Sequence, residues 1–302
     1  MTAPQPSPER RYVSPREVAA ALAVSETTVK RWVDEGRLPA RRTEGGHRRI
    51  LVADVLQYAS QRNWPHVNLG ELMGPSPGNS LATLESATLA EQLQEALTAS
   101  DADRARSLIL HAHQQGYSVA QLGDEVIAPV MGQIGHAWAC GEIDVYEEHR
   151  ATQTCLSAIL GLKARLDASN EQLRDRPLAV GGGPEKDHYL LANLLIEMTL
   201  REAGWRVMNI GPNTPFESFV RAIDQHQPRL LWLSCSHIDD VNQFVAGYRR
   251  LYAHAFGRAV AVSVGGRALT QAIREQIEFT QHGDRLAHLI AFARQTWSTP
   301  RR

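Results

Sequence analysis

The residues best suited to chemistry lie near the middle of the 302-residue chain. Trp138 is followed, after nine residues, by the pair Glu148-His149, and the run I-A-P-V-M-G-Q-I-G precedes the tryptophan. An indole offers a flat apolar face, and a neutral imidazole is a common metal ligand. Alone, Trp138 would more often belong to a core and His149 to an ordinary surface. Their joint occurrence after this run favours a ligand site.

A second cluster of side chains has the chemistry to bind phosphate. The chain carries 32 basic and 33 acidic residues, so its total charge indicates no partner. Basic residues nevertheless concentrate between positions 30 and 49, at Lys30, Arg31, Arg37, Arg41, Arg42, Arg48 and Arg49. A local basic face on a neutral protein is typical of a phosphate-binding module, and an ordinary solvated surface is the alternative on charge alone.

The elements that would position this basic cluster can be predicted from local signals. The pattern S-P-x-E at residues 14–17 is a capping box with proline at the first helical position. Ser25 caps a second helix, whose inward side carries Val29 and Trp32. The segment L-P-A-R-R-T-E-G-G-H-R-R-I then predicts two short strands joined at residues 44–46, which form a hairpin wing.

The segment from Tyr12 to Tyr58 resembles the MerR-type winged-helix DNA-binding domain, through S-x-x-T-V-K-R-W and G-G-H-R-R-I. A helix fits the major groove, and a ribbon can reach the flanking phosphates. The predicted DNA contacts are Thr27, Thr28, Lys30, Arg31, Arg41, Arg42, His47, Arg48 and Arg49. Which of Thr27, Thr28 or Lys30 touches a base edge stays open.

The rest of the chain predicts two further units in a multidomain α and α/β protein. Residues 81–168 have a helical pattern with few β-branched runs, which indicates a helical bundle. From residue 178 onward strand-like runs alternate with helical stretches, so we expect a Rossmann-like parallel sheet with ligands at the carboxyl ends of its strands. The predicted domains are a disordered tail at 1–10, the winged helix at 11–63, a linker at 64–84, a helical cap at 85–172 and the sheet domain at 173–298.

Both later units resemble parts of cobalamin-binding proteins. The spacing of Trp138 and Glu148-His149 is similar to that of the CarH family of adenosylcobalamin photoreceptors, in which the tryptophan covers the adenosyl group and the Glu-His pair borders the upper face of the corrin. After its first sheet strand this family carries Asp/Glu-x-His-x-x-Gly, where the histidine is the lower cobalt ligand and the acid orients it. His188 matches that histidine, and the resemblance assigns further cofactor-binding positions to Ser234, Gly265 and Gly266.

The chain departs from this pattern at several positions. Lys186 stands where the family has the acid, with Asp187 or Glu185 as candidate replacements. Leu191 replaces the glycine, and we expect it to crowd the nucleotide tail of the cofactor. Ser234-Cys235-Ser236 departs from a Ser-x-Leu pattern at its third position.

The resemblance covers nearly the whole chain and implies a light-responsive regulator, a repressor and not an enzyme. Adenosylcobalamin is expected between the cap and the sheet in darkness, with His188 as the cobalt ligand. His149 is a candidate cobalt ligand after photolysis. The bound state is expected to form dimers that pair into a tetramer on double-stranded promoter DNA, and green or blue light is expected to release it.

Two alternatives stay open, and the location of the protein follows from composition. The C-terminal half could be cobalamin-independent or hold another ligand such as a linear tetrapyrrole. It could also be a corrinoid carrier or isomerase, although no substrate-binding barrel is present. The distant cysteines Cys140, Cys155 and Cys235, and the lack of an apolar run near about 20 residues, predict a cytoplasmic protein without a membrane span.

Overall fold

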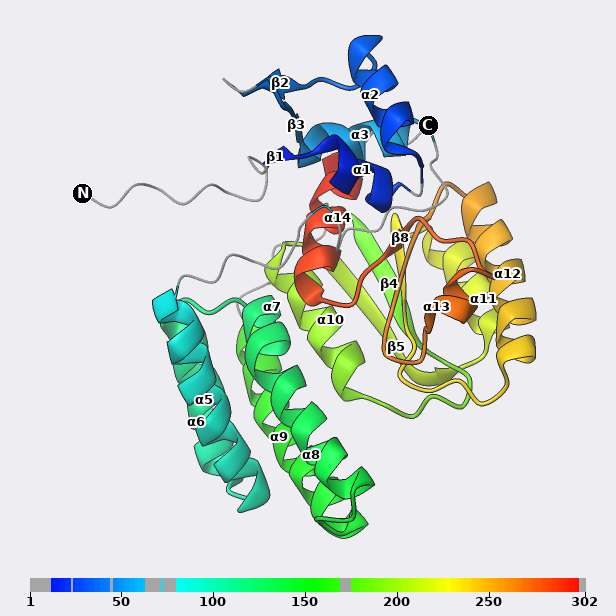
Figure 1. Cartoon of the computed structure of the whole chain (residues 1–302). Helices are drawn as coiled ribbons and strands as arrows, with labels where there is room; N and C mark the ends of the chain where they lie inside the picture. Colours follow the sequence, from blue (N-terminus) through cyan, green and yellow to red (C-terminus); the bar gives the residue numbers. More distant parts are fainter. Residues whose placement is uncertain are drawn as a thin grey trace.

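The described part of the chain folds into three units that follow one another in sequence (Figure 1). The computed structural model describes residues 12–22, 24–43, 46–62, 72, 80–168 and 175–298. The predicted tail at 1–10 and most of the predicted linker at 64–84 therefore lie outside the described residues, as do Glu44 and Gly45 of the wing.

The first unit is a small winged helix. Its elements are β1 (Tyr12–Val13), α1 (Pro15–Ala21), α2 (Glu26–Asp34), β2 (Arg41–Arg42), β3 (Arg48–Leu51) and α3 (Val52–Gln61). The three strands pair in the order β1-β3-β2, and both pairings are antiparallel. The strand β1 was not predicted, because two residues are too few to show a periodic pattern.

Local capping explains where the first two helices begin. The Ser14 hydroxyl oxygen accepts a hydrogen bond from the Glu17 amide, and the Ser14 amide donates to the Glu17 carboxylate at 2.7 Å. These reciprocal bonds are the predicted capping box. The Ser25 hydroxyl likewise accepts from the amide of Thr28. Val29 and Trp32 are buried, as expected, and Gly36 adopts the left-handed backbone that follows α2.

The second unit is a helical cap. Its elements are α5 (Ser80–Thr98), α6 (Ala102–Gln114), α7 (Val119–Gln121), the π-helix η2 (Leu122–Ile127), α8 (Ala128–Ala139) and α9 (Val145–Ala168). Apolar side chains from all of these helices form one buried cluster. In the described residues no helix is both long and apolar enough to cross a membrane.

The π-helix at residues 122–127 was not predicted from the sequence. In this segment the amide of Ala128 donates to the carbonyl of Gly123, five residues earlier. Pro129 follows directly, and proline has no N–H to donate to the carbonyl four residues before it. The α-helical ladder is therefore already interrupted here, which favours the wider turn.

The third unit is a parallel sheet with helices on both faces. Its strands are β4 (Leu178–Pro184), β5 (Arg206–Thr214), β6 (Leu230–Ser234), β7 (Ala261–Gly265) and β8 (Gln281–His282), and its helices are α10 (Leu191–Glu202), α11 (Phe216–His226), α12 (Val241–Gly257), α13 (Gln271–Arg274) and α14 (Leu286–Ser298). The strand order is β5-β4-β6-β7-β8, so the chain changes direction across the sheet between β4 and β6. This is the predicted Rossmann-like fold.

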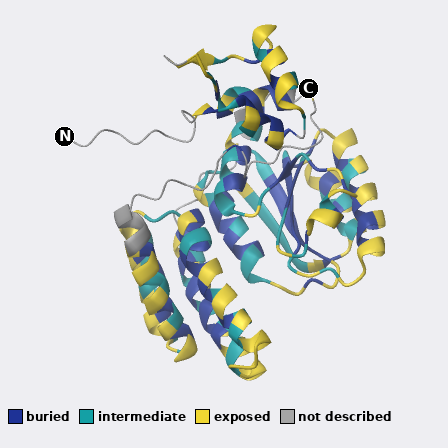
Figure 2. Ribbon diagram, in the orientation of Figure 1, coloured by how far each residue is buried: buried dark blue, intermediate teal, exposed yellow. Residues whose placement is uncertain are grey.

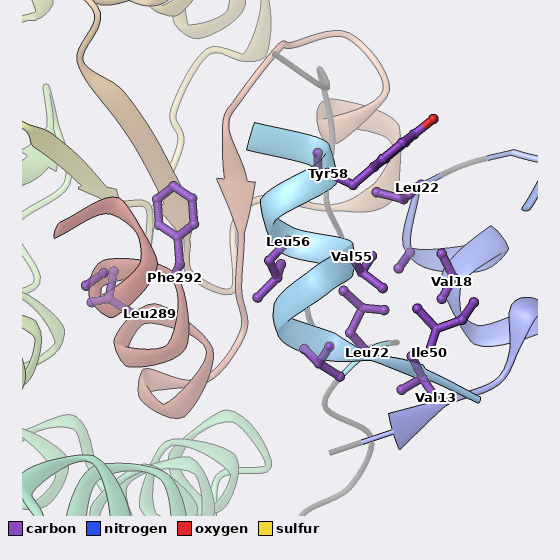
Figure 3. Close-up of a cluster of buried hydrophobic side chains, with 14 of the residues drawn as sticks. Val13, Val18, Leu22, Ile50, Val55, Leu56, Tyr58, Leu72, Leu289 and Phe292 are labelled. Atoms are coloured by element: carbon purple, nitrogen blue, oxygen red, sulfur yellow. The ribbon is translucent and has the colours of Figure 1, made fainter. Parts of the chain in front are cut away.

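The two faces of the sheet have separate cores (Figure 2). Val180, Leu231 and Val262 pack with α11 and α12 on one face. The other face, which carries Trp232, packs against α10 and α14, and its cluster continues into the winged helix. Figure 3 shows Leu56 of α3 beside Phe292 of α14. The winged helix thus packs on α14, while α2 and the wing point away from the other units (Figure 1).

A buried carboxylate fastens the cap to the sheet domain. Asp124 in the π-helix accepts hydrogen bonds from the amides of Leu286, at 2.8 Å, and Ala287, at 3.0 Å. It therefore caps the N-terminus of α14 from a different domain. Burial raises the pKa of Asp124 above its ordinary value. Gly123 beside it packs closely on α14, because an added Cβ would overlap a terminal methyl group of Leu286 and require that side chain to shift.

Replacing Asp124 should weaken the attachment between the cap and the sheet domain. We expect Asp124→Ala to lower the free energy of unfolding by about 1–3 kcal/mol, because two buried amides lose their acceptor. Urea unfolding followed by circular dichroism measures the effect. Asp103→Ala, on an exposed side chain of α6, is the matched control and should change stability by less than about 0.5 kcal/mol. Equal effects of the two substitutions would contradict the assignment.

Candidate functional site

In the predicted recognition helix α2, some of the expected DNA-contacting side chains are exposed, and others bond to side chains of the same segment. Thr27 is exposed, whereas the hydroxyl of Thr28 shares a hydrogen bond with the Ser25 hydroxyl at 2.8 Å. Lys30 forms an exposed ion pair with Glu26 at 2.8 Å, and this pair lowers the pKa of Glu26. Arg31 is exposed next to Lys30. The outward face of α2 is thus polar and accessible.

The wing places like charges opposite one another. Arg41 pairs across the ladder with Arg49, and Arg42 pairs with Arg48. Like charges directly opposite in a sheet are destabilising, so this arrangement favours a surface that meets an anion. Arg49 and His47 are exposed, and Arg41 lies over the ring of Tyr12 at 5.5 Å from its centroid.

Arg48 has a structural partner that the sequence did not reveal. Its guanidinium donates two hydrogen bonds to the Asp34 carboxylate, at 2.7 and 3.0 Å. Both bonds come from one guanidinium nitrogen, Nη2, and this charge-assisted contact connects the wing to the end of α2. Arg48 thus holds the wing in place, whereas Arg41, Arg42 and Arg49 are exposed without this partner, and the phosphate contact of Arg48 stays a prediction.

At the far end of the cap, the turn between α8 and α9 carries unusual apolar surface. Trp138, in the last turn of α8, is 49% exposed, and Val145 and Tyr146 at the start of α9 are also exposed. Glu148 accepts a hydrogen bond from the Thr152 hydroxyl at 3.0 Å. The His149 side chain is 72% exposed and lies 3.7 Å from the Glu148 carboxylate. Grouped exposed aromatic side chains of this kind indicate a ligand or partner surface.

His188 lies at the carboxyl edge of the sheet, in the loop between β4 and α10. Its side chain is exposed, and no hydrogen-bond partner is recorded for it among the described residues. The preceding residue, Asp187, is fully buried. Its carboxylate accepts hydrogen bonds from the amides of Tyr189, Ser236 and His237, at 3.0, 2.6 and 3.1 Å. The Asp187 carboxylate is therefore engaged by three backbone amides, and it makes no hydrogen bond to the His188 side chain.

The loops beside His188 are held by a network that sequence reasoning missed. The backbone amide of Asn213 donates to the backbone carbonyl of Asp187 at 2.7 Å. The side-chain oxygen of Asn213 accepts from the backbone amide of Lys186 at 2.8 Å. Lys186 and Asn213 both have left-handed backbones. The Lys186 ammonium pairs with Asp239 at 2.7 Å, which raises the pKa of Lys186 and lowers that of Asp239. Glu185 is exposed beside this pair.

The remaining predicted cofactor residues lie at the same edge of the sheet. Ser234 ends β6 and is buried. Gly265 and Gly266 are glycines for steric reasons, because an added Cβ would overlap the carbonyl oxygens of Gly283 and Cys235 respectively. Leu191, expected to crowd a nucleotide tail, instead packs against the core of the cap. That expectation was wrong about the direction of its side chain.

Comparison with known proteins gives the same domain order. Residues 12–63 match a helix-turn-helix domain, and residues 89–162 and 168–284 each match a B12 binding domain. The chain joins a helix-turn-helix domain to a two-part B12 binding module. The helix-turn-helix match covers the exposed basic wing, and a B12 binding match covers the parallel sheet with His188 at its carboxyl edge.

Relatives with this module include both regulators and corrinoid proteins. The HTH-type transcriptional repressor CarH of Myxococcus xanthus is 25% identical over 291 residues, which cover 86% of this chain and 91% of CarH. Dimethylamine corrinoid protein 2 of Methanosarcina acetivorans is 21% identical and covers 68% of this chain and 95% of its own length. The structure of the Methanosarcina barkeri monomethylamine corrinoid protein, 17% identical, superimposes with a TM-score of 0.58 over 69% of this chain and 98% of its own, which confirms the fold.

The described residues fit the two faces of a corrinoid. One face requires apolar cover and the other an imidazole, and Trp138 and His188 are exposed side chains of these two kinds; that they hold one corrinoid stays a prediction. The α8–α9 turn and the carboxyl ends of the strands lie toward the same end of the molecule (Figure 1). Where the family has an acid beside the ligand histidine, this chain has Lys186, already paired with Asp239.

Removing one arginine of the wing tests the DNA surface. We expect Arg49→Ala to weaken DNA binding and to reduce the slope of log K against log salt by about 0.9, the contribution of one phosphate contact. Fluorescence anisotropy with a promoter fragment at several salt concentrations measures the slope. Arg104→Ala, on α6 and paired with Glu95, is the control and should leave the slope unchanged. An unchanged slope in Arg49→Ala would remove the wing from the interface.

Proposed function

We propose that this protein is a transcriptional repressor whose DNA binding depends on adenosylcobalamin and ends when light breaks the cobalt–carbon bond. One observation carries the proposal: a single chain presents an exposed basic wing, and also a B12 binding module with Trp138 and His188 accessible at one end. The similarity to the repressor CarH of Myxococcus xanthus over 86% of this chain supports the same function.

The residues of the chain divide the work of holding the cofactor. When bound, adenosylcobalamin supplies the absorption of visible light and the photolabile bond. In the proposal His188 holds cobalt from below, and Trp138 covers the adenosyl group. Glu148 borders the upper face beside His149, which is the candidate cobalt ligand after photolysis because its side chain is 72% exposed and, within the described residues, contacts a charged group only at 3.7 Å, on Glu148.

The attachments of the cap support a coupling of this site to the rest of the protein. Besides Asp124, Glu202 of α10 binds both the amide of Val119, at 3.0 Å, and His113, at 3.0 Å. These contacts lie at the α7 end of the cap, away from Trp138. A ligand at the free end can thus move the cap about its fixed end. We infer that this movement changes an assembly of two dimers, which raises DNA affinity by multivalency.

One observation favours a second candidate function, a DNA-binding regulator whose sheet domain does not use cobalamin. No described carboxylate orients His188, because Asp187 is bound to three amides and Lys186 occupies the place of the acid. Such a module could hold another ligand, such as a linear tetrapyrrole. A role as a corrinoid carrier in an enzyme system is less supported, because the corrinoid proteins match 68% of this chain and the repressor 86%.

A gel shift on promoter DNA separates these functions. In darkness with adenosylcobalamin we expect a retarded complex, and green light should abolish it. His188→Ala should lose the dependence on cofactor, whereas His226→Ala, an exposed histidine of α11, should behave as the wild type. A complex indifferent to cofactor and light would support the second candidate. Corrinoid absorption bands that change on illumination provide an independent readout of cofactor binding.

A further inference from the structure

Ser234, at the carboxyl end of β6, identifies which helices cover the part of the sheet next to the His188 loop. Side chains alternate along a strand, so Trp232 and Ser234 of β6 lie on the same face of the sheet. Trp232 belongs to one buried cluster with Leu200 of α10 and Leu289 of α14. The face that carries Ser234 is therefore the face that α10 and α14 cover.

Trp232 fills this face between β4 and α10. Its side chain is only 1% exposed, and its indole N–H donates to the Asn193 side-chain oxygen at 3.4 Å. The indole lies across Gly181 of β4, where an added Cβ would overlap the ring. Because Gly181 has no side chain, the indole can rest directly on the neighbouring strand. The Trp232 indole thus fills the volume between Gly181 of β4 and α10.

Asn193 extends the closure up to the loop that carries His188. Asn193 is 1% exposed, and its side-chain amide donates to the carbonyl of Tyr189, next to His188, at 3.3 Å. A Cβ on Gly183 would lie 3.2 Å from the same amide. Between α10 and β4, the side chain nearest the His188 loop is therefore Asn193, and Trp232 follows it further from that loop.

We propose that Trp232 and Asn193 determine which corrinoids the protein selects, by excluding the lower nucleotide from the sheet domain. This inference rests on the proposed function. When His188 takes the lower position on cobalt, the benzimidazole of cobalamin, a flat bicyclic ring much like an indole, is displaced. Between α10 and β4 Trp232 already fills the volume that such a ring would need. The site recognises the macrocycle and its upper group, and leaves the nucleotide outside. Within complete cobalamin, His188 must also compete with the cofactor's own base for cobalt, whereas cobinamide has no such base.

The test compares two ligands on the full chain in darkness. Adenosylcobinamide, which lacks the nucleotide, should bind at least as tightly as adenosylcobalamin in equilibrium dialysis, and His188→Ala should weaken its binding. Adenosylcobalamin binding more than tenfold tighter than adenosylcobinamide would overturn this inference and leave the proposed function intact. If neither ligand binds, the cobalamin-dependent function fails and the inference fails with it.

A variant that removes the Trp232 indole from between α10 and β4 provides the second test. Trp232→Ala should shift the ratio of the two dissociation constants toward adenosylcobalamin by tenfold or more. Trp205→Ala removes an equally buried indole from the same cluster, at the amino end of β5 and away from the His188 loop, and should leave the ratio unchanged. If Trp232→Ala does not fold by circular dichroism, Asn193→Ala serves the same purpose with a smaller change in volume. A wild-type ratio in the opened variant would refute the role of these side chains.

Discussion

The functional edge of the sheet domain depends on the buried carboxylate of Asp187. Burying a charge is costly unless hydrogen bonds replace the lost water. Here three backbone amides on two segments supply those bonds, and the Asp187 carbonyl accepts a fourth from Asn213. Loops that follow three neighbouring strands are therefore fixed to one another. His188 projects from this fixed rim, so its position is set by backbone contacts and not by a side-chain partner of its own.

The cap is joined to the sheet domain by a second set of buried charges. Glu197 of α10 is nearly fully buried, and it contacts Lys163 of α9 at 3.1 Å, Arg201 at 3.0 Å and the side-chain amide of Asn209 of β5 at 3.0 Å. Separating one partner from this network would leave a buried charge unpaired, which is strongly destabilising. The network therefore favours one arrangement of α9 against α10. Together with Asp124, this network fixes one end of the cap. The Trp138 end has no comparable anchor among the described residues, which is the asymmetry that a sensor requires.

The winged helix combines stability and recognition on separate surfaces. Its core packs against α14 through Leu56 and the neighbouring apolar side chains, so the sheet domain supports it from below (Figure 3). The opposite surface holds arginines that repel one another across the wing. The ion pair of Arg48 with Asp34 reduces the repulsion between Arg42 and Arg48. The repulsion between the other arginines of the wing would be reduced by a bound anion. The position of this domain relative to its neighbours is thus set by apolar contact, and its preference for a polyanion by charge.

The sequence alone determined most features that depend on neighbours along the chain, although it did not reveal the π-helix at residues 122–127. The capping box at Ser14, the cap at Ser25, the hairpin of the wing and the alternation of strands and helices after residue 178 all follow from local hydrogen bonding and periodicity. Motif spacing also singled out His188 and Trp138 as candidate site residues, although no periodic signal distinguishes a free imidazole from a paired one. Very short elements such as β1 and β8 escaped detection because two residues carry no pattern.

Only the tertiary structure decided which side chains are already engaged. Asp34 and Arg48 lie 14 positions apart, and Asp187 contacts residues 49 and 50 positions later, so no local rule pairs them. The same holds for Trp232, which reads as one apolar residue in a strand but closes the face beneath α10 through Gly181 and Asn193. Local patterns fix backbone conformation because they act within a few residues. The availability of a polar or aromatic side chain depends on what folding brings against it from elsewhere in the chain.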